Sequence, residues 1–564
     1  MYTLGINYLS ESSVCLFKNN QLIYALSEER INRKKNWFGI PYKSITKLLK
    51  DNKLKLRDIK YFASHGLSAL TMDTPNNKAF EKKILLVKNS NLNINRKNKI
   101  TSLLKKRQMH EKKVIFVRTK KIISELKKKF KNIEIFDHHT SHAASAYYFS
   151  KFKNCYLLTI DGWGDNASSK LFEARNGIIK ELKRTETIDS LGYFYGSITK
   201  LLGFTPHKHE GKVLGLAAHA KPEIAMKDLD KVFGYNTQSK NFEGLSQKGY
   251  YLPTFDNILL KSLLNKYSAA EIAAATQKKL EEVVTKYIND IDKKKFDLAL
   301  AGGVFSNVKL NQIIQSNKKV NRTYVFPNMG DGGLCVGAAA LLLNKKERYK
   351  KFKVKNMYLG PDIKSYDANK NLNKFSLKEI KTANNFGFIA KSLDDGCVVG
   401  IVQGKMEFGP RSLCNRSIIS SAKDKKINLT LNKKLKRTEF MPFAPVVLQQ
   451  DFNKYFHKIE KSHSSSLYMT MTFKCKNEII KKAPGVVHID NTARPQIVNS
   501  LLNKRMYKIL KQFKKINGSG ILINTSFNMH EEPIVCSVSD AFRAFNSSKL
   551  DYLMVNDQIF KRNK

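Results

Sequence analysis

Three of the twelve histidines stand within five positions of one another, in the stretch Asp-His-His-Thr-Ser-His-Ala-Ala-Ser-Ala-Tyr-Tyr at 137–148. An alanine-rich stretch of this kind predicts a helix. On a helix, His138 and His142 are four positions apart, so both imidazole rings lie on one face and can bind the same cation. A lone pair with this spacing is usually accidental, so a metal site needs further ligands that converge on it.

Two aspartates in glycine-rich turns are the candidate partners of these histidines. Asp161 follows an apolar, strand-like run in Asp-Gly-Trp-Gly-Asp, and Asp331 lies in Asn-Met-Gly-Asp-Gly-Gly. Two imidazoles and two carboxylates without a thiolate suit a divalent ion such as Fe, Mn or Zn more than a structural zinc. We therefore predict one metal site with four ligands, His138, His142, Asp161 and Asp331. Asp161 is also a candidate catalytic residue.

Glycine-rich turns in the same part of the chain predict a nucleotide site. One follows a predicted buried strand at Phe296–Ala301 and precedes a helix, which is where a phosphate or ribose is often bound. A second surrounds Asp331, and a third carries a lysine that could pair with a phosphate. Single glycine turns are common where strands meet helices, but three beside charged residues favour a nucleotide. The predicted nucleotide-binding residues are Lys212, Gly302, Gly303, Asn307 and Gly332.

A repeated order of elements is expected to position these turns. Residues 2–26 predict a strand, a polar turn, a second strand, a hairpin turn and a third strand, and residues 155–182 predict the same order. Two-lobed nucleotide-binding folds of the actin and hexokinase kind are built from such a repeat, although weak self-similarity also arises by chance. The sequence therefore predicts an α/β fold with a two-lobed, actin-like ATPase unit.

Shifts in composition divide the chain into two predicted domains, residues 1–353 and 354–564. Residues 75–132 are rich in Lys and Asn, with a strand predicted at Val114–Val117 and a basic helix near Lys120–Phe130. We interpret 75–132 as a solvated basic insertion that binds no ligand. The second domain has apolar runs that predict strands of its own: Cys397–Val402, Ala444–Leu448, Leu467–Phe473 and Gly520–Ile523.

The chain is strongly basic. Its 564 residues include 100 Lys and Arg against 48 Asp and Glu, a formal net charge of +52. Polycations bind nucleic acid by releasing condensed counterions. Here, however, the lysines are spread along the chain, no segment interleaves Arg with aromatic residues, and no zinc finger, basic zipper or RNP-like pattern is present. Nucleic acid is therefore not the expected partner, and 42% hydrophobic residues exclude wholesale disorder.

Cysteine usage and the N-terminus bear on location. The seven cysteines are scattered and form no CxxC pair, which argues against a disulfide framework or zinc knuckle and suits a reducing cytosol. The N-terminus runs into a predicted strand at Tyr2–Ile6 without a basic region or cleavage site. No apolar run reaches the roughly 18 residues of a membrane span. The expected location is cytoplasmic. A homodimer is one option, and the sequence does not fix the oligomeric state.

An ordered series of motifs resembles the NodU/CmcH/TobZ-type O-carbamoyltransferases over nearly the whole chain. In the first domain the motifs are DHHTSHAASAYY, TIDGWGD, EGKVLGLA, LAGGVFSNVKLN and FPNMGDGG. In the second they are GKMEFGPRSLCNRSI, KRTEFMPFAP, HIDNTARPQ and INTSFNMHEEPIV. The resemblance implies a Kae1-like domain of the actin-like ATPase fold, followed by a YrdC-like α/β domain.

The resemblance also implies the chemistry. Such enzymes form carbamoyl-adenylate from carbamoyl phosphate and ATP, with Mg accompanying ATP, in the YrdC-like domain. They then transfer the carbamoyl group, at a metal site in the Kae1-like domain, to a hydroxyl of a small molecule such as a sugar, a glycolipid precursor or a natural product. By resemblance, the four ligands named above hold that metal. The residues implied to bind carbamoyl phosphate and ATP are Arg411, Lys436, Arg437, Arg494, Asn524 and Ser526.

Some positions depart from the usual residues of that family. The first turn, Ser10-Glu11-Ser12, has neither the His nor the Asp where a general base is expected, which leaves Glu11 as the candidate catalytic base. Met441 replaces the usual Arg before Pro-Phe-Ala-Pro, and Glu531 replaces the usual Gly before Glu-Pro-Ile-Val. The rival interpretations are a threonylcarbamoyl-adenosine synthase of tRNA and a non-catalytic relative that binds nucleotide or nucleic acid.

Overall fold

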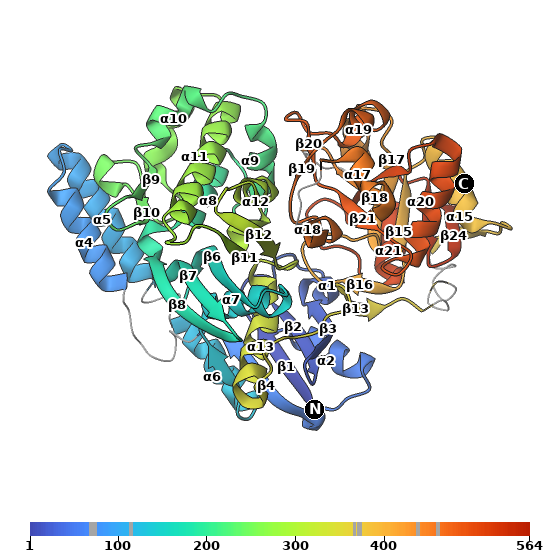
Figure 1. The fold of residues 1–564 in the computed structure, drawn as a ribbon, viewed down its shortest axis with the longest axis horizontal. Helices are drawn as coiled ribbons and strands as arrows, with labels where there is room; N and C mark the ends of the chain where they lie inside the picture. Colours follow the sequence, from blue (N-terminus) through green and yellow to red (C-terminus); the bar gives the residue numbers. More distant parts are fainter. Residues whose placement is uncertain are drawn as a thin grey trace. The chain divides into compact units, whose positions relative to one another are not determined.

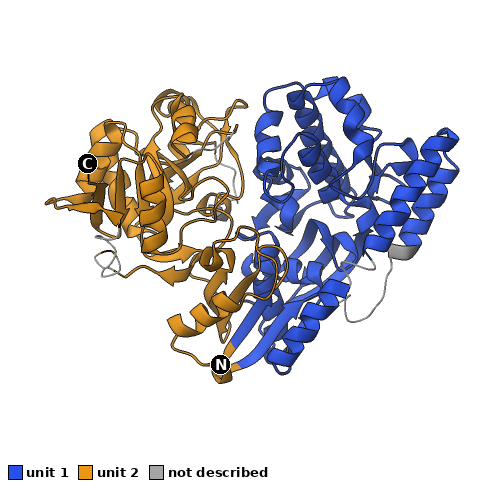
Figure 2. Ribbon diagram, turned by 180° about the vertical axis from the view of Figure 1, so that it is seen from behind, with its two compact units in different colours: residues 1, 3–7, 60–352 blue, residues 2, 8–59, 353–564 orange. Residues whose placement is uncertain are grey.

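The chain forms two compact units in a computed structural model that describes residues 1–66, 76–111, 117–364, 368, 375–435, 440–457 and 463–563 (Figure 1). Unit 1 comprises residues 1, 3–7 and 60–352, and unit 2 comprises residues 2, 8–59 and 353–564 (Figure 2). The N-terminal segment 8–59 thus belongs to the same unit as the C-terminal residues, a grouping that the sequence did not predict. The functional domains 1–353 and 354–564 stay a prediction.

The main sheet of unit 1 has the strand order β12-β11-β6-β7-β8. Its members are β6 (Asn154–Gly164), β7 (Ala167–Arg175), β8 (Ile178–Glu186), β11 (Phe296–Ala301) and β12 (Val320–Val325). Neighbouring pairs among β6, β7 and β8 are antiparallel, whereas β11 is parallel to β6 and β12. Between β7 and β8, Asn176 and Gly177 have φ values of 51° and 92°, both positive as a two-residue type I′ hairpin requires. The predicted hairpin is confirmed.

Unit 1 contains further strands and helices besides this sheet. They are β1 (Tyr2–Asn7, its first residue in unit 2), β4 (Ile59–His65, likewise), α4 (Asn76–Lys88), α5 (Ile94–His110), α6 (Val117–Lys129), β5 (Glu134–Phe136), α7 (His138–Phe149), α8 (Leu191–Leu201), α9 (Glu210–Ala217), α10 (Glu223–Leu229), β9 (Phe233–Asn236), β10 (Asn241–Gly244), α11 (Ala269–Asn289), α12 (Val308–Gln315) and α13 (Leu334–Glu347). Leu158, Leu298 and Leu300 of the sheet and Val283 of α11 are among the residues of its core.

The predicted repeat is present in the order and pairing of the strands. After β1, strands β2 (Ser13–Lys18) and β3 (Gln21–Ser27) form an antiparallel pair, as β7 and β8 do after β6. The parallel pair β4 and β5 then corresponds to the parallel pair β11 and β12. This duplication is the actin-like arrangement, and the α/β prediction is confirmed.

The basic insertion is partly buried. Its helices α4 and α5 lie side by side (Figure 1), and their inner residues join a core of unit 1 made of Phe80, Ile84, Val87, Ile100, Leu104, Ile188, Leu252 and Leu259. Lys83 is buried and forms an ion pair of 2.7 Å with Asp189. The prediction of a solvated insertion was therefore wrong for this inner face. The many charged residues dominate the composition of the segment, so the apolar residues on one face of its helices were not recognised. Of the strand predicted at Val114–Val117, Val117 begins α6 and the rest lies outside the described residues.

Unit 2 is built on an eight-stranded sheet of order β14-β24-β23-β15-β17-β22-β18-β21. Besides β2 and β3, its elements are α1 (Glu29–Asn32), α2 (Tyr42–Asp51), β13 (Tyr358–Asp362), β14 (Leu377–Ile380), α15 (Asn385–Asp394), β15 (Val399–Val402), β16 (Lys405–Glu407), β17 (Arg416–Ser421), α16 (Ile427–Leu435), β18 (Ala444–Leu448), α17 (Phe452–Tyr455), α18 (His463–Leu467), β19 (Phe473–Lys474), α19 (Asn477–Lys482), β20 (Thr492–Ala493), β21 (Gln496–Val498), α20 (Lys504–Asn517), β22 (Ile521–Ser526), α21 (Val538–Ser547), β23 (Tyr552–Val555) and β24 (Gln558–Arg562).

Three of the four strands predicted in the second domain are present, as β15, β18 and β22. The prediction at Leu467–Phe473 was wrong. Leu467 ends α18, only Phe473 enters β19, and between them Met469 has a φ of 54°, which breaks the extended backbone. Burial, not strand pairing, accounts for the apolar character of this run.

No helix in the described part of the chain combines the length and the apolarity needed to cross a bilayer.

Candidate metal centre and ligand loops

The first turn of α7 is fixed by two aspartates. Asp137 caps the helix, because its Oδ1 accepts a hydrogen bond of 2.8 Å from the Thr140 N–H. Asp165, at the end of the Asp-Gly-Trp-Gly-Asp turn, accepts a 2.7 Å bond from the main-chain N–H of His138. The rings of His138 and His142 consequently lie next to each other, with centroids 4.8 Å apart, and both residues are buried.

The two predicted carboxylates face these rings. Asp161 lies in β6, where the pairing with β7 changes register between Ile160 and Gly164, and Asp331 begins the short turn that leads into α13. The Nε2 atom of His142 is 3.2 Å from Asp161 Oδ2 and 3.5 Å from Asp331 Oδ1. The Nε2 atom of His138 is 3.9 Å and 3.6 Å from the same two oxygens. Tetrahedral donors about 2.1 Å from a metal are about 3.4 Å apart, so these separations fit one ion.

The polar atoms of this group fit a divalent cation. The ring nitrogens of His138 and His142 are buried and have no hydrogen-bond partner among the described residues. Burial lowers the pKa of His142, but the nearby carboxylates of Asp161 and Asp331 outweigh burial and raise it to about 9. Burial raises the pKa of Asp161, but contacts with both histidines hold it well below its usual value. The group therefore favours a positive charge at its centre, and His138, His142, Asp161 and Asp331 could hold a metal ion.

Two further histidines pack around His138 without joining this group. The ring of His139 is 5.3 Å from that of His138, and its Nδ1 is 2.9 Å from Thr159 Oγ1. Burial and the charge of His138 lower the pKa of His139 to about 3. His65, which the sequence did not single out, lies 5.5 Å from His138 between ring centroids and binds Asn7 Oδ1 through Nε2 at 2.8 Å. Both rings are neutral supports of the site.

Three of the predicted nucleotide-binding glycines lie beside the metal centre. The N–H of Gly303 donates to Asp161 Oδ2 at 3.2 Å. Gly302 has a φ of 106°, and a Cβ atom there would lie 2.3 Å from the Ile160 carbonyl oxygen, so only glycine fits. Gly332 directly follows Asp331. These turns place main-chain groups next to the four predicted ligands, and their binding of nucleotide stays a prediction.

The other two predicted nucleotide-binding residues have structural contacts. Asn307 caps α12, with its Oδ1 accepting from the Leu310 N–H at 3.0 Å, and its amide donates to Gln277 Oε1 at 2.8 Å. Lys212 is a buried residue of α9, with its Nζ 5.8 Å from the centre of the Phe204 ring. Whether either binds nucleotide also stays a prediction.

In unit 2, three of the predicted ligand motifs meet at Asn524. Its Nδ2 donates to Gln496 Oε1 at 2.6 Å and to the Ser412 carbonyl at 3.1 Å. Ser412 follows Arg411, and Gln496 is two residues after Arg494. The structure thus joins the loops that carry both arginines, while Asn524 itself is buried and used for this junction.

The remaining predicted ligand residues are placed as follows. Ser526 ends β22, and its hydroxyl donates to Asn528 Oδ1 at 2.6 Å. Glu11, the candidate base, has a φ of 55° in the turn between β1 and β2 and belongs to unit 2. Lys436 and Arg437 lie outside the described residues.

Sequence reasoning missed two charged residues that hold the loop containing Arg411. Glu407 Oε1 accepts hydrogen bonds from three main-chain N–H groups, those of Leu413, Asn415 and Arg416, at 2.7, 2.8 and 3.0 Å. The fully buried Arg416 guanidinium donates to five main-chain carbonyls, those of Pro361, Gln403, Gly404, Asn415 and Cys536. Nothing in the local sequence distinguishes this structural arginine from Arg411.

Comparison with known proteins gives the family. A family model described as carbamoyltransferase N-terminus matches residues 2–340, and one described as carbamoyltransferase C-terminus matches residues 390–562. The chain therefore belongs to the carbamoyltransferase family, which confirms the resemblance predicted from the motifs. It is an enzyme that carries out carbamoyl transfer, and the family implies the use of ATP and carbamoyl phosphate.

Three relatives illustrate the match. An uncharacterized protein of Methanocaldococcus jannaschii is 33% identical over 575 residues, covering 100% of both chains. The nodulation protein NolNO of Sinorhizobium fredii is 30% identical, over 98% of this chain and 79% of the relative. The 3'-hydroxymethylcephem-O-carbamoyltransferase of Amycolatopsis lactamdurans is 25% identical, over 62% of this chain and 65% of the relative.

Proposed function

We propose that this carbamoyltransferase is an ATP-dependent O-carbamoyltransferase whose acceptor is a hydroxyl of a sugar, a glycolipid precursor or a natural product. The observation that carries the proposal is the buried group of His138, His142, Asp161 and Asp331 in a chain that matches both carbamoyltransferase family models. A relative named for O-carbamoylation of a hydroxymethyl group supports the class of acceptor.

The reaction divides into two steps. Residues 354–564 join the carbamoyl group to AMP, a step that consumes one water and releases phosphate from carbamoyl phosphate and pyrophosphate from ATP. Residues 1–353 then transfer the carbamoyl group to the acceptor oxygen, which loses its proton, and AMP leaves. Arg411 and Arg494, with Lys436 and Arg437, bind the anionic substrates of the first step, because guanidinium groups match phosphate geometry.

The metal centre serves the transfer step. His138, His142, Asp161 and Asp331 would hold the ion, Fe, Mn or Zn, which would supply Lewis-acid activation of the carbamoyl carbonyl. The N–H groups of Gly162 and Gly303, 2.8 and 3.2 Å from the two carboxylate oxygens, orient Asp161 toward the histidines. Burial of both histidines excludes water from that side, which limits hydrolysis of the carbamoyl donor. Glu11 is the candidate that accepts the acceptor's proton.

Two measurements test this function. Carbamoyl-phosphate-dependent exchange of pyrophosphate into ATP should occur with metal-replete protein, and its absence would remove the adenylate from the proposal. The variant His138→Ala should abolish transfer and leave this exchange within about threefold of wild type, because the lost group belongs only to the transfer step. His219→Ala, an exposed histidine of the same unit, is the matched control. Equal loss of both steps in His138→Ala would contradict the division of labour.

The net charge of +52 favours one other candidate, threonylcarbamoyl transfer to tRNA. Binding of tRNA with a steep salt dependence, retained in His138→Ala, would support this candidate. Carbamoyl transfer to a small hydroxyl compound without tRNA would exclude it.

A further inference from the structure

Arg33, from the N-terminal segment 8–59, holds a turn of the C-terminal sequence within unit 2. It is the residue that ends α1 and has a φ of 63°. Its Nη1 donates to the Ile534 carbonyl at 2.7 Å and its Nη2 to the Pro533 carbonyl at 2.6 Å. Two N–H groups of one guanidinium thus bind two successive peptide carbonyls, an arrangement that the single ammonium of a lysine cannot reproduce.

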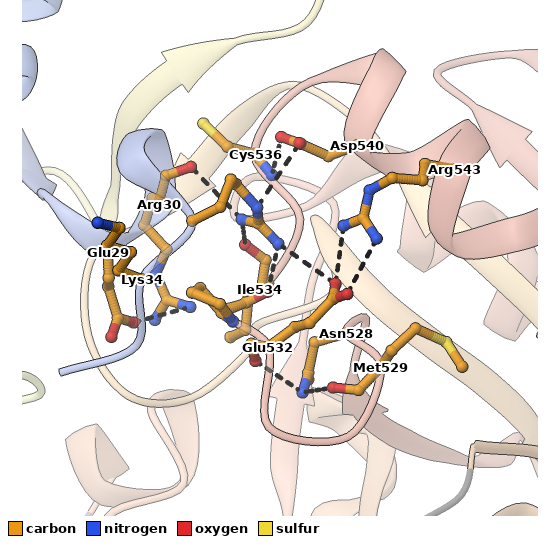
Figure 3. Close-up of polar contacts among 12 residues, drawn as sticks. Glu29, Arg30, Lys34, Asn528, Met529, Glu532, Ile534, Cys536, Asp540 and Arg543 are labelled. Carbon is orange, nitrogen blue, oxygen red and sulfur yellow. Dashed lines mark hydrogen bonds and ion pairs between the residues drawn. The ribbon is translucent and has the colours of Figure 1, made fainter. Parts of the chain in front are cut away.

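Carboxylates complete the surroundings of Arg33. Its Nε is 3.6 Å from Asp540 Oδ1, and its Nη2 is 3.9 Å from Glu532 Oε2. Arg543 binds both oxygens of Glu532, at 2.9 and 2.7 Å, from α21 (Figure 3). Glu532 is therefore held by two arginines, and the turn is fixed between α1 and α21.

The other end of the same turn is fixed by Asn528. Its Nδ2 donates to the carbonyls of Met529 and Glu532, at 2.8 and 3.1 Å (Figure 3). Its Oδ1 accepts from the Ser526 hydroxyl at 2.6 Å. The Val535 N–H donates to the Phe527 carbonyl at 2.9 Å and closes the loop. A displacement at the Arg33 end therefore moves Asn528 and Ser526.

We propose that Arg33 is a positioning residue for residues 526–536, which we call the ligand loop. The inference rests on the proposed function and on the prediction from the sequence that Ser526 belongs to the site for carbamoyl phosphate and ATP. Loss of Arg33 removes the donors to the carbonyls of Pro533 and Ile534, and Ile534 is buried. The loop then adopts other conformations, and substrate binding in the adenylate-forming step weakens while the chemical step changes little.

Hydrogen exchange tests the positioning without reference to catalysis. In Arg33→Ala and Arg33→Lys, the amides of Glu532 and Val535 should exchange at least about tenfold faster than in wild type. Arg505→Ala is the matched control, since Arg505 binds the exposed Asp557 in the same unit and no residue of the ligand loop. Should Arg33→Ala fail to fold, Arg33→Lys decides. Unchanged exchange of these amides in the folded variants overturns the proposal.

Kinetics of pyrophosphate exchange test the consequence. In Arg33→Ala, the KM for ATP or carbamoyl phosphate should rise about tenfold, with kcat within about threefold of wild type. Millimolar guanidinium should restore part of the lost affinity in Arg33→Ala and have no effect on Arg505→Ala. A fall in kcat with unchanged KM overturns the proposal. If the wild type shows no carbamoyl-phosphate-dependent exchange, the proposed function fails, and amide exchange still decides whether Arg33 positions the loop.

Discussion

Replacing Gly337 with alanine should separate α7 from α13 and weaken metal binding. A Cβ atom on Gly337 would lie 1.7 Å from the main-chain oxygen of Ser141, on α7. Since Cβ atoms essentially never come closer than 3.0 Å to another heavy atom, the two helices must move apart by at least 1.3 Å. The backbone of α13 fixes the position of the Cβ atom, and the Ser141 oxygen belongs to the backbone of α7, so no side-chain rotation relieves the clash.

The size of the effect follows from this geometry. Overpacking costs about 1–3 kcal/mol, and glycine-to-alanine replacement inside a helix returns up to about 1 kcal/mol, so the free energy of unfolding should fall by about 1–2 kcal/mol. The helix α7 carries His138 and His142, whereas Asp331 leads into α13. A shift of 1.3 Å is large against nitrogen-to-oxygen separations of 3.2–3.9 Å, and metal–ligand distances tolerate only about 0.2 Å. The metal affinity should fall at least about tenfold.

Calorimetric titration with Zn²⁺ or Mn²⁺ and urea unfolding measure the two effects. Gly234→Ala is the matched control, because a Cβ atom there would meet only Leu245 Cδ1, at an ordinary 3.6 Å. Wild-type metal affinity in Gly337→Ala, together with an unchanged unfolding midpoint, would refute the link between helix packing and the metal centre.

Three other predictions concern stability. Arg416→Met should lower the free energy of unfolding by about 3–5 kcal/mol, since it leaves buried carbonyls without donors. The control Arg505→Ala should lower the free energy of unfolding in urea by less than about 1 kcal/mol. Equal losses in the two variants would contradict the role of Arg416. Glu531 has a φ of 60°, which glycine adopts more readily than residues with a Cβ atom. In thermal unfolding, Glu531→Gly should therefore be about 1 kcal/mol more stable than Glu531→Ala. Equal stabilities would argue against strain at this turn. Hydrogen bonds lower the pKa of Asp228 to about 2, and the one from Lys231 has the largest effect. Because this pKa lies below that of an aspartate in the unfolded chain, the stabilising contribution of Asp228 is complete above about pH 4 and is lost as the pH falls toward 2. Asp228→Asn should flatten the dependence of stability on pH in that window, and an unchanged profile would contradict the assignment.

The candidate metal group could be predicted because its signals are local. A spacing of four on a helix places two histidines together whatever the rest of the fold does, and each aspartate stands beside glycines where the sequence predicts a change of element. The sequence did not show how Asp161 is directed toward the histidines. It was expected in a turn, but it lies inside β6, where a change of register with β7 alters the course of the strand.

The contacts that the sequence could not reveal join distant residues. Arg33 and Ile534 are 501 positions apart, so no local pattern assigns the N-terminal segment to unit 2. The buried face of α4 was hidden for a different reason. Its lysines dominate the composition, whereas Phe80, Ile84 and Val87 form only a narrow stripe. Asn524 was predicted as a ligand residue; it lies inside β22, and its amide serves the junction between two loops.

The arginines of unit 2 divide into two kinds, and the division changes how its basic motifs are interpreted. Arg416 donates to five main-chain carbonyls and Arg33 to three, two of which are adjacent in sequence. A guanidinium committed to carbonyls has few donors left for a phosphate, and burial of such a charge is costly unless the carbonyls remain in place. The backbone around each of these two guanidinium groups is therefore fixed. These two arginines thus determine the shape of the loops that they contact, and in our proposal recognition of the anionic substrates falls to Arg411 and Arg494.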